Sequence, residues 1–375
     1  MIENIDLKKC TGCGICVHRC PLDTLSLDPF QSEMPPCQTA CPAGVDIRGY
    51  QHFMKQRSPW LASRILGQHL PYPAITGRLC HHPCQRSCAR GAVDEAVNTP
   101  ALERYLGDFL LEKGVEKPER LQGKEIAVLG SGPAGLAGAY FLIRLGYGVT
   151  VFEKSDVIGG SLREEAAKNR LPKEVLEGQI RVIKEMGVEF KLKREMRWKT
   201  ALSGESGQPY DAVMLATGPR ANSSASIEQV QAEQIPPAVF CWGGMMKQRE
   251  PIIQVIASVK QTTERMDAYL RSDEFSPGTE KSHGLVKRLP GEGIVPENRK
   301  QQVSESKVPL NRAQALEEAR RCMTCGAKAL IAHPEDCMTC FMCEMSCPSG
   351  AITVHPFKEV IPTPIQYPAR GEDYV

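Results

Sequence analysis

The sequence predicts an α/β domain combined with a cysteine-rich α-helical domain and a small α+β unit built from both chain ends. Three patterns predict these parts. A strand pattern leads into a glycine-rich turn after residue 124, apolar residues recur at helical spacing between residues 45 and 118, and one cysteine spacing occurs near both ends. The stretch 271–310 is polar and rich in Gly, Pro and Ser, which indicates a linker.

The composition is that of a packed, soluble chain of two or three domains, at about 150 residues per domain. It has 375 residues, of which 42% are hydrophobic and 24% charged. The formal net charge of +2 creates no field that would attract nucleic acid or an anionic membrane. The N-terminal segment has no apolar signal region and no run suits a membrane span, so we expect a cytoplasmic protein.

The unusual feature is cysteine, with 16 copies. A long chain without a signal peptide does not need disulfides, so clustered thiols indicate metal binding. The groups are Cys10, Cys13, Cys16 and Cys20; Cys37, Cys41, Cys80, Cys84 and Cys88; Cys322 and Cys325; and Cys337, Cys340, Cys343 and Cys347. Cys241 stands alone, and we expect a small buried residue there.

The first and last groups share the spacing C-x2-C-x2-C-x3-C-P, which is typical of bacterial ferredoxins. A zinc site is the alternative, but zinc prefers two separated C-x-x-C pairs. Because chain ends often lie close together, we expect the halves to meet as one ferredoxin-like unit. Each cluster would then take its fourth ligand from the other half: Cys10, Cys13 and Cys16 with Cys347, and Cys337, Cys340 and Cys343 with Cys20. Two independent modules, each using its own four cysteines, are the alternative.

The segment from Lys124 to Lys154 predicts a strand, a glycine-rich turn, a helix and a second strand. Gly130, Gly132 and Gly135 form G-x-G-x-x-G, which lets backbone N–H groups approach a pyrophosphate at the helix N-terminus. Glu153 follows the second strand, where an acid accepts ribose hydroxyls. The pattern predicts a Rossmann-like dinucleotide-binding domain.

Three segments carry a family resemblance. PPCQTACPAGVDIRGY, GRLCHHPCQRSCARG and VNTPALERYLGDFL resemble the helical iron–sulfur domain of the glutamate synthase small-subunit (beta-chain) family, and dihydropyrimidine dehydrogenase carries a similar domain. The C-x-x-C pair that precedes C-x3-C-P in relatives is missing there, and EEARRCMTCG at 317–326 resembles it in a displaced position. The resemblance implies two ligand sets: Cys322, Cys325, Cys37 and Cys88, and Cys41, Cys80, Cys84 and Glu103.

The number of candidate ligands fits four [4Fe–4S] clusters, because the 15 grouped cysteines and Glu103 make the sixteen ligands that four cubanes need. Relatives place Gln or Glu at the position of Glu103. His81 and His82 stand beside Cys80 and Cys84, and we expect packing or hydrogen bonding from them rather than catalysis.

The following segments resemble the flavin domain of the same family, which implies FAD. They are IGGSLREEAAKNRLPKEVLEGQIRVIKEMGVEF, YDAVMLATGPR and VFCWGGMMKQREPIIQVIASVK, the last with Gly243-Gly244 where relatives have Gly-Asp. The candidate FAD-binding residues are Gly130, Gly132, Pro133, Ala134, Gly135, Glu153, Lys154, Gly160, Ser161, Arg170, Ala216, Thr217 and Gly218. Relatives insert an NAD(P)H domain between the last two segments. Here about two dozen residues separate them, too few for a βαβ unit of about 30 residues, so we expect that domain to be absent.

We therefore expect six parts along the chain. They are a ferredoxin half-module (1–34), a helical [4Fe–4S] domain (35–120), an FAD-binding domain (121–270), a linker (271–310), a C-x-x-C segment that completes a helical-domain cluster (311–330), and a second ferredoxin half-module with a tail (331–375).

The expected function is an electron-transfer subunit of a multi-subunit redox complex, relaying electrons between FAD and the clusters to ferredoxin or to a catalytic partner subunit. No catalytic residue is predicted, because we find no Ser-His-Asp, paired-carboxylate or cysteine-nucleophile pattern. One alternative is a self-sufficient NAD(P)H-dependent oxidoreductase resembling the glutamate synthase small subunit. The other is a zinc-binding scaffold.

Overall fold

The structure is a computed structural model that describes residues 1–7, 9–10, 15–22, 24–28, 35–119, 123–204, 207–218, 236–242, 250–271, 309–323, 325, 328–347 and 350–355. Among the sequence-based expectations, Cys13, the Gly243-Gly244 pair, nearly all of the linker 271–310 and the tail after residue 355 lie outside this range. The chain divides into two compact units. We call the one formed by the two chain ends, up to Met34 and from Met323, the terminal unit, and the other the central unit.

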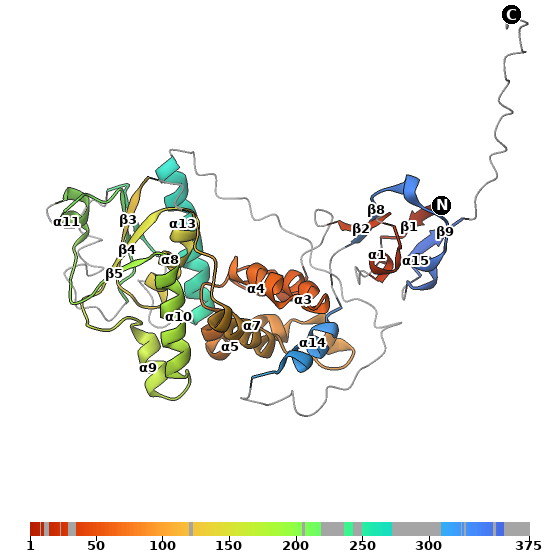
Figure 1. The fold of residues 1–375 in the computed structure, drawn as a ribbon, viewed down its shortest axis with the longest axis horizontal. Helices are drawn as coiled ribbons and strands as arrows, with labels where there is room; N and C mark the ends of the chain where they lie inside the picture. The colour runs from red at the N-terminus through yellow and green to blue at the C-terminus, as the bar shows by residue number, and fades with distance from the viewer. Residues whose placement is uncertain are drawn as a thin grey trace, which may run out of the picture. The chain divides into compact units, whose positions relative to one another are not determined.

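The terminal unit is built from two short antiparallel ladders, each with one strand from either end of the chain. Strand β1 (Ile2–Ile5) pairs with β9 (Ile352–Val354), and β2 (Leu25–Asp28) pairs with β8 (Lys328–Ile331). Figure 1 shows the red N-terminal strands beside the blue C-terminal ones. The short helices are α1 (Ile15–Arg19), η4 (Pro334–Asp336) and α15 (Met342–Met345). The two ends thus meet in one small core, as the repeated cysteine spacing predicts.

The helical part of the central unit consists of short helices. They are α2 (Pro36–Thr39), α3 (Ile47–Lys55), α4 (Pro59–Gly67), α5 (Pro73–Leu79), α6 (Pro83–Arg86), η1 (Ala89–Ala92), α7 (Thr99–Lys113) and, from the C-terminal side, α14 (Arg312–Arg320). Four of them, α2, α4, α5 and α6, begin at a proline. Proline suits the first helical turn because its fixed φ is already helical. An N–H at that position would have no partner within the helix, so its absence costs nothing. Helix α3 begins instead at Asp46, whose side chain accepts from the Gly49 N–H over 2.8 Å. In Figure 1 the blue helix α14 lies beside α3 and α7.

The α/β part contains a parallel sheet in the order β5-β4-β3-β6-β7. Its strands are β3 (Glu125–Leu129), β4 (Gly148–Phe152), β5 (Glu189–Lys191), β6 (Ala212–Leu215) and β7 (Val239–Cys241). The helices are α8 (Pro133–Arg144), α9 (Ser161–Ala167), α10 (Lys173–Glu185), α11 (Trp198–Ser203) and α13 (Ile252–Arg271). Strand order reverses around β3, and in such Rossmann-like sheets ligands bind at the carboxyl ends of the strands there. This is the dinucleotide-binding architecture that the glycine-rich turn predicts.

The helical part and the sheet share one apolar core and are joined by buried hydrogen bonds. The Tyr72 hydroxyl donates to the carbonyl oxygen of Pro133 over 3.1 Å, and the Tyr140 hydroxyl donates to that of Gly67 over 2.7 Å. Because Pro133 begins helix α8, the segment before α5 is tied to the first turn after the glycine-rich loop. In the part of the chain that the structure describes, no helix has the length and apolarity that crossing a membrane requires.

Candidate cofactor sites

A cavity of about 570 Å³ lies at the carboxyl ends of β3, β4 and β6. Sites for cofactors and other small molecules commonly have this size. Its wall contains all the residues predicted for FAD except Gly135: Gly130, Gly132, Pro133, Ala134, Glu153, Lys154, Gly160, Ser161, Arg170, Ala216, Thr217 and Gly218. The sequence pattern thus locates this cavity.

The glycines of the turn are required by close backbone contacts. Gly130 has φ +105°, and a Cβ there would lie 2.8 Å from the carbonyl oxygen of Ala216. A Cβ at Gly135 would lie 1.9 Å from the carbonyl oxygen of Gly130. Gly135 therefore lets helix α8 approach the turn and lies behind the cavity wall rather than in it.

The carboxylate of Glu153 is fixed by two serines. Ser131 donates from its N–H (2.9 Å) and its hydroxyl (2.6 Å) to Oε2, and Ser155 donates from both groups to Oε1, each over 2.9 Å. Burial raises the pKa of Glu153, but these hydrogen bonds outweigh it and hold the pKa below its usual range. Glu153 is therefore an ionised acceptor at the cavity wall.

Trp242 also lines this cavity, although the sequence did not single it out. It is 6% exposed, and its indole N–H finds no hydrogen-bond partner among the described residues. A buried donor is normally satisfied, so its position in the cavity wall suits a ligand with acceptor atoms. Arg170 and Arg194 add positive charge to the same wall. A cradle with backbone turns, arginines and an unsatisfied donor fits a dinucleotide.

In the helical part, Cys41, Cys80, Cys84 and Glu103 come together. Cys80 ends α5, Cys84 lies on α6 and Glu103 on α7. Helices α5 and α7 approach to backbone contact, because a Cβ at Gly77 would lie 2.5 Å from the Arg104 nitrogen. A Cβ at Gly107 would lie 2.2 Å from the Ala74 nitrogen. These glycines bring the end of α5 against the buried carboxylate on α7.

The three thiols and the carboxylate of this group are acids that are buried close together. Burial is the main cause that raises the pKa of the Cys80 thiol, to about 12. The charges of Glu103 and Cys41 add to the rise, and backbone hydrogen bonds oppose it. Burial and the same two charges raise the pKa of Cys84 further. Burial is also the main cause that raises the pKa of Cys41. A positively charged iron centre would relieve this repulsion, and the thiolate set with one oxygen donor fits an iron–sulfur cluster.

His82 and Tyr50 complete the surroundings of this group. The imidazole of His82 lies between the carbonyl oxygen of Cys80 (2.8 Å from Nδ1) and Oε2 of Glu103 (3.1 Å from Nε2). Tyr50 is fully buried, and among the described residues its hydroxyl has no partner at good hydrogen-bond geometry, although Gln51 lies beside it. Burial, followed by the charges of Glu103 and Cys84, raises its pKa well above the usual value. An unsatisfied hydroxyl beside these ligands again suits an acceptor, such as cluster sulfide.

Cys88 and Cys322 lie near each other in the central unit, and Cys37, predicted with them, packs against the same core. All three are half-buried against its core. Burial is the main cause that raises the pKa of Cys88, and the charge of Cys322 adds to it. The amine of Lys55 donates to the Cys322 carbonyl oxygen over 2.6 Å. Cys325, predicted with this set, falls in the terminal unit.

Cys322 is held by a buried ionic network that the sequence did not reveal. Arg321 pairs with Asp94 (3.0 Å) and with Glu318 (2.9 Å). Arg90 pairs with Asp94 over 2.6 Å and donates to the Arg321 carbonyl oxygen over 3.0 Å. The Asn98 N–H donates to Glu318 over 2.6 Å. The network fastens α14 and the residue before Cys322 to the segment that follows Cys88.

In the terminal unit, Cys20 shares a small pocket with Cys337, Cys340 and Cys343. Burial raises the pKa of Cys343, and the charges of Cys20 and Cys337 add to the rise. The pocket thus brings one cysteine from the N-terminal half to three from the C-terminal half. That is the combination expected from the crossed ligand arrangement.

Cys10, Cys16 and Cys347 belong to the apolar core of the same unit. The Ala329 N–H lies 3.3 Å from Sγ of Cys10, and the Ala351 N–H lies 3.3 Å from Sγ of Cys347. Backbone N–H groups directed at sulfur are among the groups that adjust cluster potentials. Cys13, the fourth member of the predicted set, lies outside the described residues.

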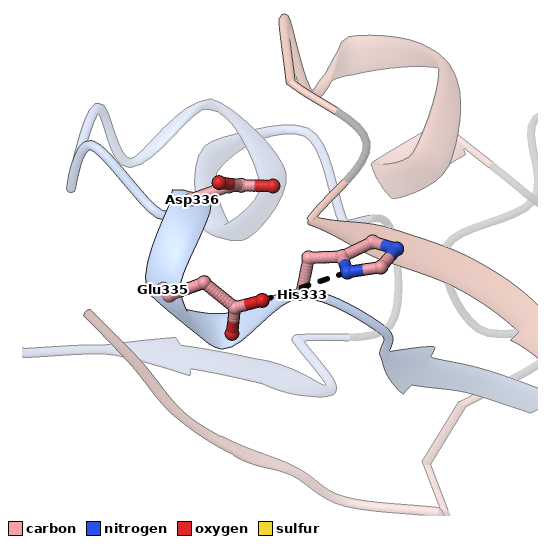
Figure 2. A group of neighbouring side chains, drawn as sticks. All are labelled: His333, Glu335 and Asp336. Atoms are coloured by element: carbon pink, nitrogen blue, oxygen red, sulfur yellow. Dashed lines mark ion pairs between the residues drawn. The ribbon is translucent and has the colours of Figure 1, made fainter.

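Two further features contribute no site. His333, Glu335 and Asp336 form an exposed group, with His333 Nδ1 3.6 Å from Oε1 of Glu335 (Figure 2). An exposed group of this kind is common without a metal, and we assign none. Cys241 was expected to be buried; on the short strand β7 it is only half-buried.

Comparisons with known proteins match the same regions. Residues 29–115 match the family "dihydropyrimidine dehydrogenase domain II, 4Fe-4S cluster", residues 89–236 match "pyridine nucleotide-disulphide oxidoreductase", and residues 3–26 match "4Fe-4S binding domain". These regions cover most of the predicted cofactor-binding parts before residue 237.

Three curated relatives illustrate the similarity. The beta subunit of NADP(+)-dependent formate dehydrogenase from Moorella thermoacetica is 32% identical over 55% of this chain and 32% of its own length. The PreT subunit of NAD-dependent dihydropyrimidine dehydrogenase from Salmonella typhimurium is 31% identical over 54% and 50%. The small chain of glutamate synthase [NADPH] from Bacillus subtilis is 36% identical over 42% and 32%.

The matched part of the chain spans between a third and a half of these relatives' lengths. The two larger family matches agree with the structure of this chain, in which a helical cysteine-rich part is followed by a dinucleotide-binding sheet. In these regions the chain is therefore similar to FAD and iron–sulfur oxidoreductases, including the glutamate synthase small chain.

Proposed function

We propose that the chain is an electron-transfer subunit of a multi-subunit redox complex, carrying one FAD and four [4Fe–4S] clusters. The observation that carries this proposal is the junction of two candidate sites. Leu79 lines the dinucleotide cavity, and the next residue, Cys80, belongs to the group with Cys41, Cys84 and Glu103. A flavin in that cavity would lie next to a cluster ligand, as electron transfer requires.

The proposed ligand sets follow the groups described above. One set, Cys41, Cys80, Cys84 and Glu103, lies in the helical part. The second takes Cys37, Cys88 and Cys322 from the central unit and adds Cys325 from the sequence pattern. The other two sets are crossed between the chain ends: Cys20 with Cys337, Cys340 and Cys343, and Cys347 with Cys10, Cys13 and Cys16. The shared pocket of Cys20 supports the crossed sets, whereas Cys325 and Cys13 rest on the sequence pattern alone.

Flavins exchange electrons in pairs or singly and cubane clusters exchange single electrons, so together they convert between the two kinds of transfer. The residues of this chain bind, orient and shield these groups. The turn at Gly130 and the first turn of α8 would hold the pyrophosphate, and Glu153 the ribose. Leu79 and Trp242 also line this cavity, and their apolar surfaces would exclude water from it.

Electron exchange with partners is part of the same proposal. The short interval between Gly218 and Val239 leaves no room for an inserted NAD(P)H domain. We therefore infer that electrons reach or leave the chain through a catalytic partner subunit or ferredoxin. Several relatives bear the names of beta subunits of larger enzymes, including an NADPH-Fe(3+) oxidoreductase, which supports a partner of this kind.

The test is the content of iron, acid-labile sulfide and flavin per chain after purification without oxygen. About sixteen irons and one FAD support the proposal, since each cubane holds four irons. About eight irons would contradict two of the ligand sets. Bleaching of the flavin by NADPH in the isolated chain would favour a self-sufficient oxidoreductase, and colourless protein with bound zinc would favour the scaffold.

A further inference from the structure

His82 is held between two groups that belong to the same candidate cluster site. Its Nδ1 lies 2.8 Å from the carbonyl oxygen of Cys80, and its Nε2 lies 3.1 Å from Oε2 of Glu103. The side chains of His82 and Glu103 are 6% and 5% exposed. Neither contact competes with water, so both depend on the fold alone.

The two contacts fix the orientation of the imidazole. A carbonyl oxygen only accepts hydrogen bonds, so Nδ1 carries a hydrogen and donates to Cys80. Nε2 is then directed at Oε2 of Glu103, and the ring links the backbone at Cys80 to the carboxylate on α7.

The backbone of His82 indicates that this arrangement is enforced. Its φ is +45°, in the left-handed region that non-glycine residues rarely adopt, and Pro83 restricts it further. The preceding histidine, His81, is exposed. Strained residues persist where the surrounding structure fixes them, often at functional sites. The left-handed backbone of His82 thus holds its imidazole against Glu103.

We propose that His82 is the positioning residue for Glu103 as a cluster ligand. The inference rests on the proposed function, because it takes Glu103 as the fourth ligand beside Cys41, Cys80 and Cys84. His82 fixes Oε2 and leaves Oε1, which has no hydrogen bond among the described residues, for iron. A hydrogen bond to a ligand draws electron density from it, so loss of this contact should lower the potential of the cluster.

Two amide substitutions distinguish the contact made by Nε2 of His82 from the contact made by Nδ1. The amide of His82→Gln reaches as far as Nε2 and can donate to Glu103. The amide of His82→Asn reaches only as far as Nδ1 and can donate to Cys80, and asparagine tolerates the left-handed backbone. His81→Asn is the matched control, and Glu103→Ala removes the ligand itself. The full chain is purified without oxygen, and folding of each variant is checked by thermal melting and FAD content.

The readouts are iron per chain, the electron paramagnetic resonance spectrum of the reduced protein, and the midpoint potential of each cluster. We expect His82→Asn to shift one spectrum and lower its potential, or to lose about four irons, the content of one cubane. His82→Gln and His81→Asn should resemble wild type. A wild-type spectrum and potential in His82→Asn would overturn the inference, as would equal losses in His82→Gln and His82→Asn. If Glu103→Ala retains iron and spectrum unchanged, the ligand set itself is wrong.

Discussion

The hydroxyl of Tyr72 donates a hydrogen bond to the carbonyl oxygen of Pro133 over 3.1 Å. Tyr72 precedes helix α5, which ends at Cys80, and Pro133 is the first residue of the helix behind the glycine-rich turn. Tyr72 is fully buried, and Pro133 is half-buried. The contact therefore fixes the candidate cluster site relative to the candidate flavin site.

Tyr72→Phe should destabilise this junction without removing apolar packing. It leaves the Pro133 carbonyl without this donor, and we expect a loss of about 1 kcal/mol in the free energy of unfolding. For a unit of this size that corresponds to a decrease of about 2–4 °C in the apparent Tm. Thermal melting of the FAD-loaded chain measures it. Tyr105→Phe, on the half-buried face of α7, is the control, and equal melting of both variants would contradict the prediction.

Gly107→Ala should separate helices α5 and α7. The new Cβ would lie 2.2 Å from the Ala74 nitrogen, and a backbone atom cannot move aside as a flexible side chain can. We expect Glu103 to move away from the three thiols and the iron content to fall by about four atoms, one cubane. Gly91→Ala is the matched control, because its Cβ would meet nothing closer than 3.8 Å. Iron analysis of both variants decides the matter, and retention of all iron in Gly107→Ala would contradict this packing.

Arg321→Ala should release the segment that carries Cys322. It leaves the buried carboxylates of Asp94 and Glu318 with one cation fewer, and breaking a buried pair in this way costs about 3–5 kcal/mol. We expect a lower apparent Tm and the loss of about four irons, the content of one cubane. The neighbouring Arg320 is exposed, so Arg320→Ala should behave as wild type. Similar melting of the two variants would show that the network does not hold α14.

Trp242→Phe should weaken FAD binding. Trp242 lines the cavity, and its indole N–H has no hydrogen-bond partner among the described residues. Loss of one neutral hydrogen bond of about 1 kcal/mol corresponds to a roughly fivefold rise in Kd. Flavin fluorescence should also increase, since an indole next to the flavin quenches it. Trp198→Phe, outside the cavity, is the control. Unchanged Kd and fluorescence in Trp242→Phe would mean that the indole does not meet the flavin.

Acid should destabilise the central unit through His69. Burial and the charge of Lys260 lower the pKa of His69 from 6.5 to about 4, and Lys260 donates to Nδ1 of the neutral ring over 3.0 Å. Between these two pKa values the unfolded chain binds a proton that the folded chain does not. Stability is therefore full above pH 6.5 and declines toward pH 4. His69→Gln should decline less in apparent Tm between pH 7.5 and 5.5, and the exposed His81→Gln should follow wild type. Parallel curves for all three would refute the assignment.

Local patterns predicted the elements whose determinants are close in sequence. The strand, glycine turn and helix around Gly130 were recognisable because the turn requires glycine at fixed intervals. The terminal ladders were predictable because the same cysteine spacing occurs twice, which is a form of internal repeat. The helix at Ile47–Lys55 followed from its apolar periodicity, and Ile47, Tyr50 and Met54 are its buried residues.

The remaining site residues depend on contacts that no local pattern encodes. His82 was expected to pack or form hydrogen bonds, but its partner Glu103 lies 21 residues away on another helix. The pairing of Arg321 with Asp94 spans 227 residues. Trp242 lies in the segment that begins at Val239. Only the folded structure shows that it lines the cavity and that its N–H lacks a partner among the described residues. Long-range pairs of this kind are determined by the fold as a whole.

The pairing of Ile2 with Val354 has a consequence for biosynthesis. Strands β1 and β2 are separated from their partners by more than 300 residues. At about 5–20 residues per second, synthesis of that interval lasts on the order of 15–70 s. During this time the N-terminal cysteine group is without its other half. The terminal unit can therefore fold only after residue 354 has been synthesised, whereas the parallel sheet of the central unit can form earlier, while synthesis continues.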